Sequence, residues 1–204
     1  QGMAQSGSGV ARLSNVGLAL TAMKQIKAAT AQMPRIAVLS GPPGYGKTQA
    51  AMHLAHPLGE SAAYISLRMF ETTKSLAELL LTELDVRFKT SWTTAQKFDA
   101  ICERLATTQR TLVVDEVDHI AEKASIDFLR AIHDQVATPI FLIGEEQLQR
   151  KLLQKHERFH DRVLVWANAV PCDQVDALEL ARHYAPGLRF TDDAIRALLA
   201  RSQG

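Results

Sequence analysis

The sequence predicts an α/β fold of three layers, in which a five-stranded parallel sheet lies between layers of helices. The chain has 204 residues, of which 47% are hydrophobic and 22% charged, so it can bury one sizeable core. Short apolar or β-branched runs alternate with segments of helical periodicity, a pattern typical of parallel strands buried on both faces. The predicted strands are 35–40, 62–67, 111–115, 139–144 and 162–166.

A helix is expected before the first strand. Ser14 and Asn15 form a capping signal, and apolar positions then recur at helical spacing up to about residue 30. Later helices are expected between the strands, and after Pro171 the strands stop and two more helices should form a small appendage. These later helices are predicted at 47–56, 75–84, 94–106, 125–136, 146–155, about 173–184 and 192–201.

These patterns divide the chain into three segments. Residues 1–11 are expected to be a flexible lead-in, because two residues precede Met3 as after cleavage of an expression tag and a Gly/Ser-rich stretch follows. Residues 12–170 should form the α/β domain, and 171–204 the helical appendage.

Composition leaves the partner open. The formal net charge is +1, so any contact with nucleic acid must come from a local patch. Cys102 and Cys172 lack C-x-x-C spacing, which disfavours a disulfide framework or a thiolate metal site and fits a reducing cytoplasm. No apolar run of about 18 residues and no signal pattern occurs, so neither a membrane span nor export is expected.

A glycine-rich loop follows the first predicted strand and matches G-x-x-x-x-G-K-[ST] at every fixed position. Backbone N–H groups of such a loop close around phosphate oxygens, and the next helix presents its positive end. Lys47 should reach the β and γ phosphates, and Thr48 should hold Mg²⁺. The stretch therefore predicts binding of ATP with Mg²⁺, through Gly41, Pro42, Pro43, Gly44, Tyr45, Gly46, Lys47, Thr48 and Gln49.

The third predicted strand ends in Asp115, whose carboxylate is placed to hold Mg²⁺. Glu116 follows directly and could orient and deprotonate a water for attack on the γ phosphate, which favours hydrolysis over phosphate transfer. The letters DEVDH also match a helicase box, but no partner helicase motif is found and the chain is too short for two core domains. Asp118 and His119 are therefore expected to support the site or face solvent.

The order of the glycine-rich loop, "VVDEVDHI", "PIFLIGEEQLQRKLLQKHERFHDRVLVW" and a helical tail resembles the AAA+ ATPases. The resemblance covers roughly residues 12–204. Within the AAA+ ATPases, the sequence resembles one branch in particular. This branch includes the Mu B-type target-selection ATPases of transposition, the transposon regulator ATPases, the ExeA-type secretion ATPases and the origin-recognition initiators. The resemblance implies that the strand before the glycine-rich loop lies centrally, next to the strand ending in Asp115, and that the helical appendage is a lid.

The resemblance also implies polar residues that sense the γ phosphate. The first sensor should end the fourth strand, where Glu145 or Glu146 stands in place of the more usual Asn, Thr or Ser; either could instead cap the next helix. The second sensor is a Gly-x-x-Arg motif in the lid, of which Gly204 would be the first residue.

An arginine just before the fifth strand is a further implication of the resemblance. Arg162 directly precedes "VLVW", and Arg158 lies one helical turn earlier. Either could neutralise charge on the γ phosphate bound to a neighbouring subunit. The alternative is a solvated helix end, in which these arginines pair loosely with Glu157 and Asp161.

The same region contains "HERFH", residues 156–160, which matches the zinc-peptidase pattern H-E-x-x-H. A zinc helix needs both histidines on one buried face and a third ligand. Here charged residues follow at once and a strand begins soon after, and the next candidates, Glu179 and His183, lie in the predicted appendage. The pattern is therefore interpreted as incidental.

An arginine supplied to a neighbouring subunit requires a ring or filament of copies stacked head to tail. Basic residues in loops, repeated along such an assembly, could follow the backbone of duplex DNA without reading its sequence. Arg68, Lys74 and Lys123 are the candidates. The sequence thus favours a cytoplasmic ATPase of a bacterium or phage-infected cell that selects DNA targets for a transposase. The alternatives are a secretion or assembly ATPase with protein partners, and a phosphate-loop kinase.

Overall fold

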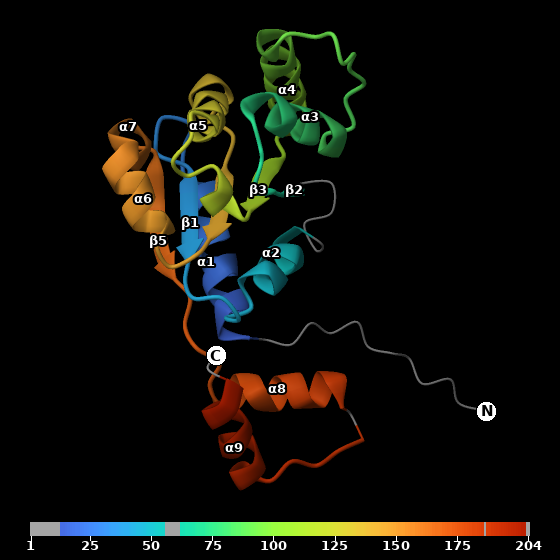
Figure 1. The fold of residues 1–204 in the computed structure, drawn as a ribbon, viewed down its shortest axis with the longest axis vertical. Coiled ribbons are helices and arrows are strands. Elements are labelled where there is room, and N and C mark those ends of the chain that lie inside the picture. The colour runs from blue at the N-terminus through green and yellow to red at the C-terminus, as the bar shows by residue number, and fades with distance from the viewer. Residues whose placement is uncertain (1–12, 56–61, 186, 203–204) are drawn as a thin grey trace, which may run out of the picture.

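The computed structural model describes residues 13–55, 62–185 and 187–202. Five parallel strands form one sheet in the order β2-β3-β4-β1-β5, with helices on both faces (Figure 1). This confirms the predicted three-layer α/β fold. The predicted lead-in, residues 1–11, and Gly204 lie outside the described residues. The strands are β1 (Ile36–Ser40), β2 (Ala62–Ser66), β3 (Thr111–Asp115), β4 (Ile140–Gly144) and β5 (Val163–Asn168).

The strand order corrects one expectation. β1 was expected to lie centrally, beside the strand that ends in Asp115, but β4 lies between β1 and β3. Ile140 of β4 pairs with Ile36 of β1 and with Leu112 of β3. All five residues of β4 are buried, whereas β5 is partly exposed, so the more apolar strand takes the interior position and β5 forms the edge beside β1.

The helices follow the predicted pattern, with shifted ends. The segment predicted as 146–155 is shorter, and the chain breaks at His156 before a further single turn. The helices are α1 (Ser14–Ala28), α2 (Lys47–Ala55), α3 (Thr73–Glu83), α4 (Thr94–Thr108), η2 (Val117–His119, a 3-10 turn), α5 (Ser125–Val136), α6 (Leu148–Lys155), α7 (Glu157–His160), α8 (Gln174–Tyr184) and α9 (Asp192–Ser202). Within the described ranges, no helix is long and apolar enough to cross a membrane.

The core consists of two apolar clusters, one on each face of the sheet. Alternate residues of a strand point to opposite faces, so Phe141 of β4 joins one cluster and Leu142 the other. α1 and α2 cover the first face, and α3, α4, α5 and α6 cover the second. α8 and α9 pack on each other beyond the carboxyl end of the sheet (Figure 1).

The expected cap at the start of α1 is wrong. The N-cap residue is Leu13, and no side chain of that segment caps the helix. The N–H and the hydroxyl of Ser14 instead donate to Asp176 Oδ1 of α8, at 2.8 and 3.2 Å. Asn15 is 6% exposed and donates from Nδ2 to the carbonyls of Tyr45 and Val170 at 2.7 and 2.8 Å. These side chains join α1 to the glycine-rich loop and to α8 because their partners come from distant parts of the chain.

We predict that Phe141→Ala lowers the free energy of unfolding by about 3–5 kcal/mol, because it leaves a cavity around a fully buried ring in the middle of the sheet. Urea unfolding measures the change. Phe70→Ala is the matched control: this ring is 87% exposed, and its removal should change stability by less than about 0.5 kcal/mol. Equal losses in the two variants would contradict the assigned core.

Candidate functional site

The glycine-rich loop connects the end of β1 to the start of α2, as the motif requires. Gly44 and Gly46 have φ values of 87° and 70°, a backbone conformation that other residues adopt only with strain. A Cβ added to Gly41 would lie 2.7 Å from Cβ of Ala169, which follows β5, so a side chain there would push the two strand ends apart. The glycines therefore give the loop its shape and let it lie against the sheet.

Lys47 holds its side chain within the loop. Nζ donates to the carbonyls of Gly41 and Pro42 at 2.8 and 2.7 Å. Burial lowers the pKa of Lys47, and the nearby carboxylates of Asp115, Glu116, Asp118 and Glu145 act in the opposite direction. The ammonium group is therefore held against backbone carbonyls of the loop, near a cluster of acids.

A pocket of about 330 Å³ lies where the glycine-rich loop meets the carboxyl ends of β3 and β4. It brings together most of the residues that the sequence predicted for nucleotide and metal binding. Of the two candidates for the first sensor, Glu145 lines this pocket and Glu146 does not. The lining residues are Pro43, Gly44, Gly46, Lys47, Thr48, Gln49, Asp115, Glu116, Gly144 and Glu145.

Asp115 and Glu116 lie at the end of β3 in a fixed arrangement. Asp115 is 2% exposed; its Oδ1 accepts the N–H of Glu116 at 2.9 Å, and its Oδ2 accepts the hydroxyl of Tyr64 at 3.2 Å. Burial, together with the charge of Asp115, raises the pKa of Tyr64 to about 12, so the hydroxyl stays protonated and donates this hydrogen bond to Asp115. Glu116 has φ 59° and ψ 37°, a strained conformation for a residue other than glycine and one found at functional sites.

Asp118 links this loop to the end of β4. Its carboxylate accepts the N–H of Glu145, and Nζ of Lys151 lies 3.7 Å away. A Cβ added to Gly144 would lie 2.2 Å from Oδ2 of Asp118, so this contact requires a glycine. The Asp118 side chain is only 8% exposed, which favours the supporting role over the solvated one.

The contribution of Tyr64 was not predicted from the sequence, because nothing local marks a tyrosine in an apolar strand as a partner of Asp115.

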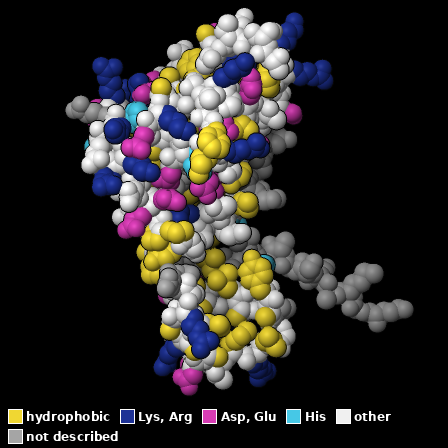
Figure 2. Space-filling view, in the orientation of Figure 1, with side chains coloured by type: hydrophobic (Ala, Val, Ile, Leu, Met, Phe, Trp, Pro, Cys, Tyr) yellow, Lys and Arg dark blue, Asp and Glu magenta, His cyan; other side chains and the backbone are white. Residues whose placement is uncertain are grey.

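A second, largely apolar pocket of about 450 Å³ adjoins the first, and the two share Gly44 and Gly46. Figure 2 shows hydrophobic side chains gathered over α8 and α9, where this pocket lies. Its walls come from the start of α1, the glycine-rich loop and the two helices after the sheet. Among the lining residues are Asn15, Val16, Tyr45, Asp176, Leu180, Tyr184, Phe190, Ile195 and Leu199.

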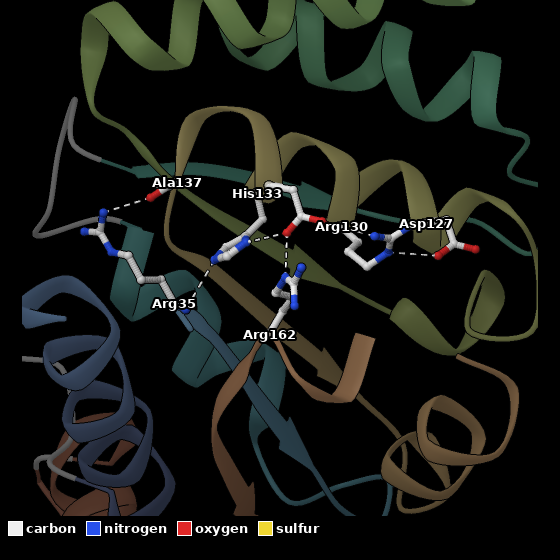
Figure 3. Close-up of polar contacts among 7 residues, drawn as sticks. Arg35, Asp127, Arg130, His133, Ala137 and Arg162 are labelled. Carbon is white, nitrogen blue, oxygen red and sulfur yellow. Dashed lines mark hydrogen bonds and ion pairs between the residues drawn. The ribbon is translucent and has the colours of Figure 1, made fainter. Parts of the chain in front are cut away.

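The arginines before β5 lie at the other end of the sheet. The carbonyl of Arg162 accepts the N–H of Ile36 at 3.1 Å, so Arg162 is beside the start of β1, whereas the glycine-rich loop follows its end. Nε of Arg162 donates to Asp134 Oδ1 of α5 at 2.7 Å (Figure 3). The alternative, loose pairing with Asp161, is therefore wrong for Arg162, whose ion pair is with Asp134. Arg158 is exposed, and it has no ion pair with any described residue.

The two histidines of "HERFH" make separate contacts. His156 is the C-cap residue that follows α6, and its Nδ1 lies 3.4 Å from Asp127 Oδ2 of α5. His160 stacks on Trp166 of β5, with ring centroids 6.0 Å apart. In the part of the chain that the structure describes, no group of three His, Cys, Asp or Glu side chains is placed to hold a metal ion.

The three candidate DNA contacts lie on neighbouring segments. Nζ of Lys123 donates to the carbonyl of Met69 at 3.1 Å, next to Arg68 in the loop after β2. The hydroxyls of Thr73 and Ser125 are 3.1 Å apart, so the start of α3, which carries Lys74, meets the start of α5. The structure thus joins the segments that carry these basic residues, although they are far apart in the sequence.

Comparison with known proteins agrees with this arrangement. A family model described as "AAA domain" matches residues 31–152, more than half of the chain. The chain belongs to the AAA domain family. None of the curated proteins compared with it by sequence matches significantly.

Solved structures resemble this AAA domain over most of its length. The ORC2 protein of Aeropyrum pernix, in ADPNP and ADP complexes, has a TM-score of 0.67 at 13% identity and covers 93% of this chain. Cdc6p from Pyrobaculum aerophilum has a TM-score of 0.68 at 14% identity and covers 95%. The ORC1 protein of A. pernix in complex with DNA has a TM-score of 0.63 at 18% identity and covers 84%.

The TM-scores show a shared fold, and sequence identities of 13–18% show nothing beyond it. The AAA domain spans about half the length of these proteins, 55%, 57% and 48% respectively.

Gly144→Ala tests the contact between the ends of β3 and β4 in this AAA domain. The new Cβ must displace the Asp118 carboxylate from the N–H of Glu145, and we expect a loss of about 1–3 kcal/mol in unfolding free energy together with lower ATPase activity. Gly17→Ala on α1 is the control, because a Cβ there meets nothing within 4 Å. Unchanged stability and activity in Gly144→Ala would contradict the contact.

Proposed function

We propose that this AAA domain binds ATP with Mg²⁺ and hydrolyses it to ADP and phosphate. The observation that carries the proposal is the pocket in which the glycine-rich loop, Lys47, Thr48 and the acids after β3 and β4 converge. Membership of the AAA family supports an ATPase. Backbone N–H groups, the start of α2 and the ammonium of Lys47 would hold the phosphates.

The residues of the pocket fit a magnesium ion. The Thr48 hydroxyl and the Asp115 carboxylate supply oxygen ligands, which Mg²⁺ prefers. When bound, the ion neutralises charge on the phosphates. Glu116 would orient the attacking water and accept its proton, and the hydrogen bond from its N–H to Asp115 holds it in place. Glu145 would lie beside the γ phosphate as the first sensor.

The apolar pocket is suited to the base and ribose of the nucleotide, because its walls are apolar and it adjoins the pocket that would hold the phosphates, with which it shares Gly44 and Gly46. In this proposal residues 12–170 form the nucleotide-binding domain, and 171–204 form a lid that closes over the base. Asp176 would tie the lid to the start of α1 through its bonds from Ser14.

We further propose that Arg162 acts on ATP bound to a second copy of the chain, with Arg158 as the less favoured candidate. Arg162 precedes β5, at the end of the sheet opposite its own glycine-rich loop. It therefore cannot reach the phosphates of its own subunit, and a ring or helical filament of copies would bring it to those of a neighbour.

For the wider role we propose non-specific binding of duplex DNA during target selection for a transposase. The segments with Arg68, Lys74 and Lys123 are joined, and repetition in an assembly would give a row of positive charge. The ORC1 neighbour, solved in complex with DNA, supports DNA as the partner. The order of motifs supports the transposition branch. The alternatives, an ATPase acting on protein partners and a phosphate-loop kinase, have less support from this surface.

Two substitutions test the nucleotide site. Lys47→Ala should abolish nucleotide binding, whereas Glu116→Gln should bind ATP normally and lose about 10²- to 10⁴-fold in turnover, because only the proton acceptor is removed. Binding is measured with a fluorescent ATP analogue, and turnover by phosphate release. Turnover in Glu116→Gln equal to that of the unmodified protein would show that Glu116 does not accept the proton.

The assembly and the partner are tested by measuring ATPase rate against protein concentration, with and without duplex DNA, at two salt concentrations. We expect the rate per subunit to rise with concentration and with DNA, and the DNA effect to weaken at the higher salt. Arg68→Glu with Lys74→Glu should reduce the DNA effect, whereas Lys24→Glu with Lys27→Glu, which also reverses two charges at exposed positions of α1, should not. A rate independent of both concentration and DNA would contradict the proposal; a protein-directed ATPase would ignore DNA, and a kinase would ignore concentration.

A further inference from the structure

Arg162 contacts α5 through only one nitrogen of its guanidinium group (Figure 3). Nε donates to Asp134 Oδ1 at 2.7 Å, and the side chain is 39% exposed. Neither terminal nitrogen donates to any residue that the structure describes. The guanidinium is therefore held at its base, while the forked end that can bind two phosphate oxygens stays free.

Asp134 is itself held from two further sides. Its Oδ2 accepts Nη1 of Arg130 at 3.1 Å, and its Oδ1 lies 3.4 Å from Nδ1 of His133. Burial alone would raise the pKa of Asp134, but the hydrogen bonds from Arg162 and His133 outweigh it and keep the pKa below its ordinary value. The carboxylate is therefore charged, and Arg130 and His133 hold it in the position in which it binds Arg162.

The ring of His133 anchors this carboxylate to β1. Its Nε2 accepts the N–H of Arg35, the residue before β1, at 3.2 Å, so the proton of the neutral ring is on Nδ1 and points to Asp134. Burial lowers the pKa of His133, so the ring stays neutral and does not compete with Arg162 as a cation. The guanidinium of Arg35 also donates to the carbonyl of Ala137 at 2.8 Å, which fixes the end of α5 beside the same strand.

We propose that Asp134, oriented by His133, is the positioning residue that holds Arg162 ready to act on ATP bound to a second copy of the chain. The inference rests on the proposed role of Arg162. A long arginine side chain loses much conformational freedom when it binds a phosphate, and a contact at Nε removes most of that freedom in advance. When the forked end binds the phosphate, Asp134 can keep its bond to Nε.

The neighbouring acid, Asp127, shows what a purely structural ion pair on this helix looks like. It lies on α5 two turns before Asp134 and pairs with Arg130 at 3.1 Å and with His156 at 3.4 Å. It has no hydrogen bond to Arg162. Asp127→Ala therefore removes an equivalent charge and one of the two ion pairs of Arg130, and it leaves the contact between Asp134 and Arg162 in place.

The test measures steady-state ATPase, ATP binding and thermal unfolding of the full chain at assembling concentrations. We expect Asp134→Ala to lower kcat by about 10- to 100-fold with ATP affinity unchanged, because its own ATP site is intact. Asp127→Ala should keep its activity. An Asp134→Ala subunit keeps its own ATP site and lacks only the positioned arginine that it supplies to a neighbour. Mixing it with Glu116→Gln, which still supplies that arginine, should restore hydrolysis at mixed interfaces. Mixing it with Arg162→Ala should not, because neither subunit then supplies the arginine. The double variant Asp134→Ala/Arg162→Ala should be no slower than Arg162→Ala alone.

The outcomes separate the two proposals. Three results would overturn the positioning role of Asp134 and leave the role of Arg162 intact. The first is a normal kcat in Asp134→Ala, and the second is a loss of kcat that mixing with Glu116→Gln does not rescue. The third is a loss of kcat that adds to the loss in Arg162→Ala. Full activity of Arg162→Ala would overturn both. If Asp134→Ala unfolds, Asp134→Asn keeps the shape of the side chain and is expected to show the same pattern with a smaller loss.

Discussion

The constraint on which the structure depends is that all five strands of the sheet are parallel, so that their carboxyl ends share one edge. The glycine-rich loop leaves β1 at that edge, Asp115 ends β3, and Glu145 follows β4. Because β4 lies between β1 and β3, its end is held between the phosphate loop and the acids of β3. The same constraint sends the residues that precede the strands, Arg35 and Arg162, to the opposite edge.

The parts of the site that could be predicted from the sequence are those in which one continuous segment carries the chemistry. The glycine-rich loop needs its glycines and Lys47 at fixed spacing, and Asp115 and Glu116 stand at the end of an apolar strand. The local sequence is therefore enough to predict these residues as candidates. Strand order was not predictable in this way, because periodicity shows that a strand is buried but not which strands adjoin it. The role of Tyr64 was missed, and that of Asp118 was left open between support of the site and exposure to solvent, for a related reason: each depends on a partner from another strand or loop.

The misassigned cap of α1 has a similar cause, because the partners of its polar side chains come from distant parts of the chain. Ser14 and Asn15 are typical capping residues, yet each gives its hydrogen bonds to distant groups, Ser14 to Asp176 in α8 and Asn15 to the glycine-rich loop and the segment after β5. A local rule predicts local satisfaction of a polar group, but a buried polar side chain binds whichever partner the packing brings. Here these partners connect α8 and the phosphate loop, so the residues bear on the site and not only on the helix.

The charge of the pocket at the glycine-rich loop connects the proposed hydrolysis with the proposed assembly. Among the described residues that line the pocket, Lys47 is the one cation, and it faces Asp115, Glu116 and Glu145. A bound triphosphate would add further negative charge to a pocket that is already acidic, so one ammonium group and the start of a helix are too little to balance the charge of the transition state. The divalent ion of the proposed mechanism would supply part of the difference. The remainder fits an arginine from a second copy, and the geometry around Arg162, with its base held by Asp134 and its forked end free, is what such a contribution requires.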